Sequence, residues 1–107
     1  MGNGKGIATY YKKELFTVDI EISHETAQIA KFRSEKIDII HVYRSNTHKL
    51  ENLTMDITDM IEENQATLIA GDFNVCNKRS PKNKLNETLI NKGFTQLVTE
   101  EIGRAHV

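Results

Sequence analysis

The spacing of apolar residues along the chain constrains its fold more than any other feature. In residues 15–22 apolar and polar side chains alternate, which is the pattern of a strand with one buried face. Residues 6–11, 26–32 and 37–43 show similar short runs, separated by connections of only a few residues. Four consecutive strands with short connections predict an antiparallel meander.

The next part of the chain switches to helical spacing. Between residues 47 and 64 apolar side chains recur at steps of three and four. This predicts an amphipathic helix, with Asn46 or Thr47 available as its N-cap. A second helix is expected from Ser80, which is followed by a proline at the first helical position, to a glycine stop at Gly93.

Two further apolar runs complete the pattern. Residues 67–70 are continuously apolar and predict a strand buried on both faces, and residues 94–98 predict one more strand. Mostly antiparallel strands with flanking helices place the chain in the α/β class.

Composition narrows the possible functions. The 107 residues are 38% hydrophobic and 27% charged, which fits one globular domain. Cys76 is the only cysteine, so an internal disulfide and a multi-cysteine zinc site are excluded. The net charge of −1 excludes a wholly cationic nucleic-acid binder but allows a local basic patch. No stretch has the length of a transmembrane helix or the apolar core of a secretory signal, so we expect an intracellular protein without a membrane partner.

The strongest local motif is Gly71-Asp72-Phe73-Asn74, directly after the apolar run. Side chains at positions i and i+2 of extended chain project to the same side, so Asp72 and Asn74 can face one point. A carboxylate there can orient a water molecule, and a carboxamide can donate to a phosphate oxygen. The alternative is a plain turn, because Gly, Asp and Asn are also the usual residues for leaving a strand.

The order of several segments resembles the endonuclease/exonuclease/phosphatase superfamily, and within it the apurinic-type endonuclease domains of non-LTR retrotransposons and related mobile elements. Tyr43-Arg44-Ser45-Asn46 resembles the family's Tyr-x-x-Asn strand end, which precedes a helix and a Gly-Asp-Phe-Asn strand end. Residues 4–11 resemble the Gly-rich lead into its central strands, and residues 93–98 its Gly-Phe-x-x-Leu-Val segment. The resemblance implies a two-sheet α/β sandwich.

The resemblance also implies an activity and site residues. The activity is phosphodiester hydrolysis assisted by Mg²⁺ or Mn²⁺, with DNA as the substrate. Tyr43 would contact the scissile phosphate, Asp72 would position or activate the attacking water, and Asn74 would hold the phosphate or the water beside it. Asn46 is a further phosphate-contacting candidate.

Two features of the family have no counterpart in this chain. Its closing histidine directly follows an aspartate, and no aspartate here is followed by histidine. Its metal-holding glutamate would lie upstream of Met1, so the metal ligands are unknown. We therefore expect residues 1–101 to be an internal part of such a domain that is inactive alone. In the full protein we expect a reverse transcriptase or helicase region on the same chain and a nuclear location.

Two other functions stay open. The superfamily includes phosphatases that act on inositol phosphates or lipid head groups, and a non-catalytic remnant could only bind nucleic acid. A basic stretch behind the motif could follow a DNA backbone, or it could be an ordinary solvated face. Its members are Lys78, Arg79, Lys82 and Lys84.

The histidines and the C-terminal tail are given no catalytic role. We expect His41 to be structural within its strand, and His24 and His48 to be isolated surface residues. Residues 102–107 break the resemblance and match the in-frame translation of a common sequencing adapter, so we expect a processing scar or an unstructured tail.

Overall fold

Strands and helices follow one another largely in the predicted order. The structure is a computed structural model that describes residues 8–74 and 83–96. In chain order its elements are β1 (Thr17–Ser23), β2 (Ala27–Arg33), β3 (Asp38–Arg44), α1 (Leu50–Met60), β4 (Thr67–Asp72) and α2 (Lys84–Asn91). One four-stranded sheet with two helices confirms the predicted α/β class.

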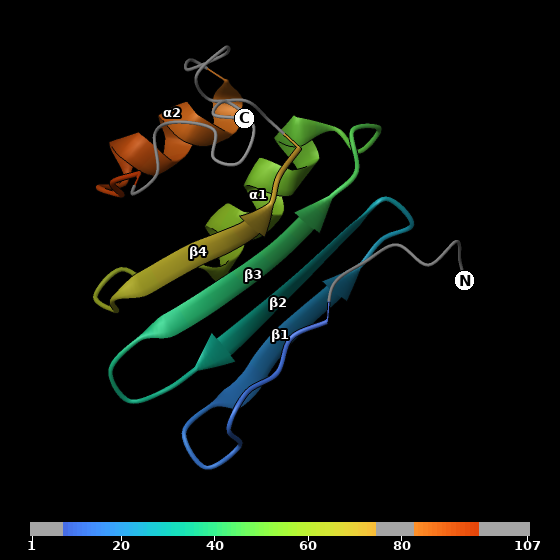
Figure 1. Ribbon diagram of the computed structural model, residues 1–107. Helices are drawn as coiled ribbons and strands as arrows, with labels where there is room; N and C mark the ends of the chain where they lie inside the picture. Colours follow the sequence, from blue (N-terminus) through green and yellow to red (C-terminus); the bar gives the residue numbers. More distant parts are fainter. Residues whose placement is uncertain (1–7, 75–82, 97–107) are drawn as a thin grey trace, which may run out of the picture.

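The four strands lie in the order β1-β2-β3-β4 (Figure 1). β1, β2 and β3 pair antiparallel through short turns, and β4 pairs parallel with β3 after the chain has passed through α1. Ser34 closes the β2–β3 turn, because its hydroxyl donates to the Ile37 carbonyl at 2.6 Å and accepts the Ile37 N–H at 3.1 Å. The parallel pairing places the carboxyl ends of β3 and β4 at the same edge of the sheet.

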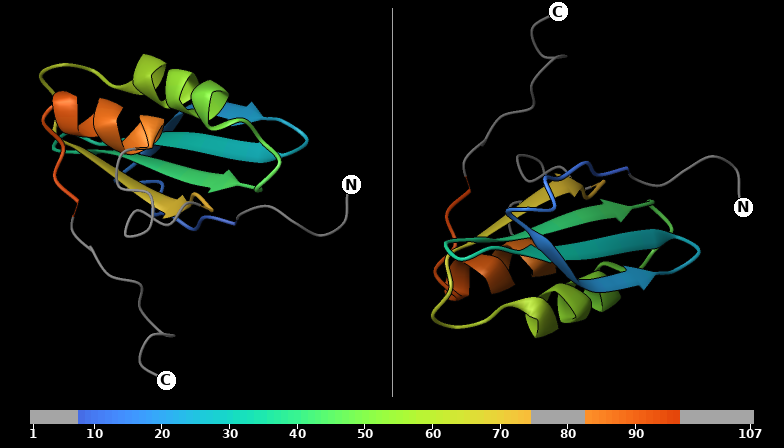
Figure 2. Two further views of the ribbon diagram at one scale, coloured as in Figure 1. Left: turned by 90° about the horizontal axis from the view of Figure 1, so that it is seen from above. Right: turned by 90° about the horizontal axis from the view of Figure 1, so that it is seen from below.

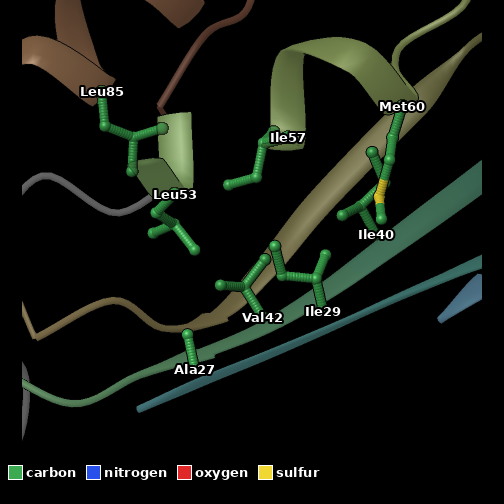
Figure 3. Close-up of a cluster of buried hydrophobic side chains, with 8 residues drawn as sticks. All are labelled: Ala27, Ile29, Ile40, Val42, Leu53, Ile57, Met60 and Leu85. Atoms are coloured by element: carbon green, nitrogen blue, oxygen red, sulfur yellow. The ribbon is translucent and has the colours of Figure 1, made fainter. Parts of the chain in front are cut away.

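Both helices cover one face of the sheet, as the two views of Figure 2 show. Alternate residues of β2 and β3 point into this layer, where α1 and α2 meet them. Burying each large aliphatic side chain contributes about 1.5–3 kcal/mol. The core consists of Ala27, Ile29, Ile40, Val42, Leu53, Ile57, Met60 and Leu85 (Figure 3).

The opposite face of the sheet is covered only in part, by the N-terminal segment that runs across it (Figure 2). The ring centroids of Tyr11 and Phe32 lie 5.0 Å apart. Further along the same segment, the Thr9 hydroxyl lies 2.5 Å from Nδ1 of His41. Leu68 of β4 remains 39% exposed on this face.

A buried lysine joins β2 to the far end of α1. Lys31 is 1% exposed, and its ammonium group donates to the Met60 carbonyl at 2.6 Å and to Glu62 at 3.1 Å. One carboxylate oxygen each of Asp19 and Asp38 lies 3.6 Å from the same nitrogen. Three carboxylates thus surround one buried cation near the amino-terminal end of β3.

Within the described residues the antiparallel meander has three strands, so the predicted four-stranded meander is wrong. Residues 8–11 form no strand, because the chain turns at Lys12, whose carbonyl accepts the Leu15 N–H at 2.9 Å, and the segment before the turn crosses the sheet face. Residues 94–96 form no strand either, because the Phe94 N–H donates to Leu89 at the end of α2. The rest of both predicted strands lies outside the described residues.

The first predicted helix is confirmed, but its predicted start is wrong. α1 begins at Leu50 and its N-cap is Lys49, which makes no side-chain capping bond. The predicted caps belong to a turn that precedes the helix, where the His48 N–H donates to the Ser45 carbonyl at 3.1 Å. In the same turn the hydroxyls of Ser45 and Thr47 lie 2.8 Å apart.

The second helix is shorter than predicted. Asn83 is its N-cap, and the Asn83 side chain accepts the Asn86 N–H at 2.8 Å. The predicted cap, Ser80, lies outside the described residues. The glycine stop is confirmed, since Gly93 has a φ of 94° and its N–H donates to Ile90 at 3.0 Å. Neither helix of the described segments has the length and apolarity needed to cross a membrane.

The prediction that β4 is buried on both faces is wrong. Its exposure alternates along the strand, and Leu68 and Ala70 are exposed while Ile69 packs against the core. The reason is that β4 is the outer strand of the described sheet and the helices cover only one of its faces.

Candidate functional site

Tyr43 and Asp72 are neighbours across the parallel β3–β4 pair. Each is the register partner of the other, near the carboxyl ends of the two strands. Residues paired in register share a face of the sheet, and here it is the face away from the helices. Tyr43 is half-buried and Asp72 is exposed, so a ligand could reach both. The structure brings together these two residues, both of which the family resemblance implies as site residues.

Gly71 allows β4 to approach β3 this closely. Its φ is 147°, and a Cβ atom at this position would lie 1.9 Å from the Val42 carbonyl oxygen. Any side chain would therefore collide with the β3 backbone. The glycine that precedes the aspartate is required by the pairing itself.

Asp72 and Asn74 form a side-chain-stabilised turn. One oxygen of the Asp72 carboxylate accepts the Asn74 N–H at 3.2 Å, and Asn74 adopts a left-handed φ of 57°. The motif therefore forms a turn, as the alternative interpretation predicted, and this turn occupies one of the two carboxylate oxygens. The other oxygen has no hydrogen bond to any part of the chain that the structure describes.

The Asn74 side chain is partly occupied. Its amide nitrogen donates to the Arg44 carbonyl at 3.1 Å, which joins the turn to the end of β3. A carboxamide has two hydrogens on nitrogen and an acceptor oxygen, so one hydrogen and the oxygen have no partner among residues 8–74 and 83–96 and could bind a ligand.

Arg44 is part of this site, although the sequence analysis gave it no role. It is 9% exposed, and one guanidinium nitrogen donates to the Phe73 carbonyl at 3.0 Å and to the Asn74 carbonyl at 3.3 Å. Burial lowers the pKa of the Arg44 guanidinium, which nevertheless remains charged. The sequence contains a signal for this role, because Arg44 falls on the same side of β3 as Ile40 and Val42, which face the core. A charged side chain at a core position needs hydrogen-bond partners.

The remaining predicted residues are less closely connected. Asn46 is exposed in the turn after β3 and forms no hydrogen bond with Tyr43, Asp72 or Asn74 in the described segments. Lys84 is exposed at the start of α2. The other basic candidates, Lys78, Arg79 and Lys82, lie outside the described residues.

The prediction that His24 and His48 are isolated is wrong, and so is the predicted surface position of His48, whereas His24 is exposed as predicted. Their ring centroids lie 5.2 Å apart, and Nε2 of His24 lies 3.2 Å from an Asp56 oxygen. His48 is buried, and its Nδ1 lies 2.8 Å from the Thr26 hydroxyl. The pKa of His48 is lowered by burial first and then by the nearby charges of His24 and Arg44, against a raising effect of Asp56.

The described residues do not form a complete magnesium site. No group of three or more His, Cys, Asp or Glu side chains placed to hold a metal ion occurs in residues 8–74 and 83–96. Near the strand ends Asp72 offers one carboxylate oxygen that has no hydrogen bond to the described part of the chain. Mg²⁺ in proteins takes one or two carboxylates together with waters and substrate phosphates, so Asp72 alone supplies the minimum.

Comparison with known proteins adds no further information on this site. Protein-family models, curated proteins and solved structures give no match to the chain.

Proposed function

We propose that this chain carries the phosphate-contacting strand pair of a metal-dependent phosphodiesterase that nicks DNA, of the kind found in mobile-element endonucleases. The observation that carries the proposal is the pairing of Tyr43 with Asp72 at the carboxyl ends of parallel strands. Ligands of α/β sheets commonly bind at this end of the strands. A hydroxyl donor and a carboxylate acceptor side by side suit a phosphate oxygen and a water molecule.

Each residue has a separate task in this proposal. The free oxygen of Asp72 accepts a proton from the attacking water, which bonds to phosphorus as the bond to the leaving oxygen breaks. The Tyr43 hydroxyl and the remaining amide hydrogen of Asn74 donate to the phosphate oxygens, where negative charge builds up. The leaving oxygen takes its proton from solvent.

A bound Mg²⁺ ion would neutralise phosphate charge. Asp72 is the only carboxylate near the strand ends that the described residues offer to such an ion. The proposal therefore assigns to the chain's own residues only binding, orientation and the movement of one proton.

The basic stretch favours DNA over a small phosphate ester. Lys78, Arg79, Lys82 and Lys84 follow the motif in sequence, and Lys84 is exposed. Contacts with several successive phosphates of a strand give binding that weakens strongly with salt, whereas a single phosphomonoester needs no such stretch. A reverse transcriptase or helicase partner on the same chain and a nuclear location belong to the same proposal.

The test is nicking of supercoiled plasmid in the presence of Mg²⁺ by the protein expressed from the full source reading frame. We expect Asp72→Asn to lower the rate by about 10²–10⁴-fold, the range typical of a lost general base. Tyr43→Phe removes only the hydroxyl and should lower the rate as well. Matched controls are Asp59→Asn, an exposed acid on α1, and Tyr10→Phe, whose side chain is 93% exposed.

The possible outcomes separate the three functions. Undiminished nicking in Asp72→Asn and Tyr43→Phe would refute the site. Release of phosphate from inositol phosphates, with the plasmid left intact, would favour the phosphatase alternative. Salt-sensitive DNA binding without either reaction would identify a binding remnant.

A further inference from the structure

Arg44 connects both loops that carry candidate residues at the carboxyl edge of the sheet. One loop is the 72–74 turn and the other is the 45–48 turn, which holds Asn46. We propose that Arg44 is a positioning residue that fixes these two loops relative to each other and thereby sets the geometry of the site. What the site binds rests on the proposed function, but the positioning is a property of the chain itself.

The contacts of the guanidinium run in two directions. One terminal nitrogen donates to the Phe73 and Asn74 carbonyls at 3.0 and 3.3 Å. The inner nitrogen, Nε, donates to the His48 carbonyl at 2.8 Å. The main chain of Arg44 completes the bridge, since its carbonyl accepts the Asn74 side-chain amide at 3.1 Å.

The chemistry of this position requires arginine. Arg44 is 9% exposed, and a buried cation is stable only when hydrogen-bond partners replace the water that it has lost. Its donors diverge in a planar fork, so one side chain can satisfy carbonyls on two different loops. The ammonium group of a lysine is a single point and cannot reach both.

The turn in return depends on this anchoring. Asn74 adopts a left-handed φ of 57°, a conformation that asparagine tolerates better than most residues but that still needs local hydrogen bonds to hold it. The hydrogen bonds from Arg44 hold the Phe73 and Asn74 carbonyls on either side of this left-handed position. When the turn is fixed, one oxygen of Asp72 accepts the Asn74 N–H. The other oxygen stays available beside Tyr43.

The first experiment is amide hydrogen exchange by NMR on the full chain, comparing Arg44→Lys with Arg33→Lys. Arg33 is a matched control because it is exposed and pairs with Glu62 at the far end of the sheet. We expect Arg44→Lys to speed exchange of the Asn74 and His48 amides at least 10-fold while the Ile40 amide of the central strand stays protected. Arg33→Lys should leave both loop amides as they are.

A side-chain measurement separates positioning from general stability. In Arg44→Lys we expect the carboxyl carbon resonance of Asp72 to shift, although the melting temperature and the protection of β3 show an intact fold. A purely structural role would leave that resonance unchanged in the folded protein. Unchanged resonance and unchanged exchange at Asn74 and His48 would overturn the proposal.

A measurement on the unmodified chain decides the matter even if Arg44→Lys fails to fold. Rotation about the Nε–Cζ bond of Arg44 should be slow enough to resolve its terminal nitrogen-bound hydrogens as separate signals. A guanidinium that rotates as freely as that of Arg33 would contradict the bridge. None of these readings needs a nucleic acid, so failure of plasmid nicking would refute the proposed function and leave the positioning inference standing.

Discussion

At the amino-terminal end of β3 a buried cation is surrounded by carboxylates, whereas at its carboxyl-terminal end a buried cation is surrounded by backbone carbonyls. Lys31 pairs with Glu62, Asp38 and Asp19, and Arg33 pairs with two of the same carboxylates, so every charge of this network has an opposite charge beside it. Arg44 instead binds the carbonyls of two loops, and the Asp72 carboxylate in one of these loops has no cationic partner in the described residues. We call the amino-terminal end of β3 the closed end, because its charged groups pair with one another. We call the carboxyl-terminal end the open end, because the Asp72 carboxylate there remains available for a ligand.

The largest effect is expected from the closed end. Lys31→Met removes the cation and leaves the buried Asp38 carboxylate facing an apolar side chain, which typically costs about 3–5 kcal/mol. Urea unfolding should show this loss, while Lys36→Met, an exposed change in the β2–β3 turn, should stay within about 0.5 kcal/mol of the parent. Equal stability of the two variants would show that the Lys31 network does not support the fold.

The next effect concerns the close approach of β4 to β3 at the open end. Gly71→Ala places a Cβ atom 1.9 Å from the Val42 carbonyl oxygen and adds a side chain at a φ of 147°. Together the strain and the overlap should cost about 2–4 kcal/mol. Gly93→Ala is the matched control, because φ is also positive there, at 94°, but no atom lies within 4 Å of the added Cβ.

The comparison of these two glycine variants by thermal unfolding isolates the steric part. Gly93→Ala should show only the conformational cost, about 1–2 kcal/mol. If Gly71→Ala is no worse than Gly93→Ala, the tight β3–β4 contact that brings Asp72 beside Tyr43 is wrong.

The two ends should lose stability in different ranges of pH. His48, next to Arg44, has a lowered pKa, so the folded state favours its neutral form. This contribution is complete above the unfolded-state value of about 6.5 and is lost as the pH falls below it. Glu62 at the closed end has a pKa lowered mainly by the hydrogen bond from Lys31, so its contribution is present above 4.5 and is lost only at more acidic pH.

Urea midpoints measured from pH 8 to pH 3 test this separation. His48→Asn keeps a side chain that can bond to the Thr26 hydroxyl, and it should flatten the loss between about pH 7 and 5. Glu62→Gln should flatten only the more acidic part. A curve that is unchanged by His48→Asn would show that the buried imidazole does not report on the open end.

Much of this structure could be predicted from local patterns, and the errors have definite causes. Alternation predicted β1, β2 and β3, because one face of each strand is buried by the helices. The strand at β4 was predicted as well, but its burial on both faces was not correct, since a continuous apolar run does not reveal that a strand lies at the edge of a sheet. Alternation failed for residues 8–11 because the decision to pair with a neighbour or to cross the sheet face depends on contacts distant in sequence, such as that between Thr9 and His41.

At the candidate site, too, contacts between residues near in sequence could be predicted and contacts between distant residues could not. The Gly-Asp-Phe-Asn motif predicted that Asp72 and Asn74 act together, and short-range turn chemistry is visible in sequence. Arg44 and His48 were missed because their partners come from other elements. A charged residue in the buried phase of a strand was the available signal for Arg44, whereas nothing in the sequence places Thr26 beside His48.

The smallest effect on stability, and the sharpest contrast between the two ends, is expected from one substitution made at both. Asp38→Asn alters a buried carboxylate that faces Lys31 and should cost about 1–3 kcal/mol. Asp72→Asn alters an exposed carboxylate, and the carboxamide oxygen can still accept the Asn74 N–H, so we expect a change within about 0.5 kcal/mol. Asp72→Asn should nevertheless lower the rate of plasmid nicking in the full reading frame by about 10²–10⁴-fold. A large loss of stability in Asp72→Asn would mean that this carboxylate belongs to the fold, and the distinction between a closed end and an open end would then disappear.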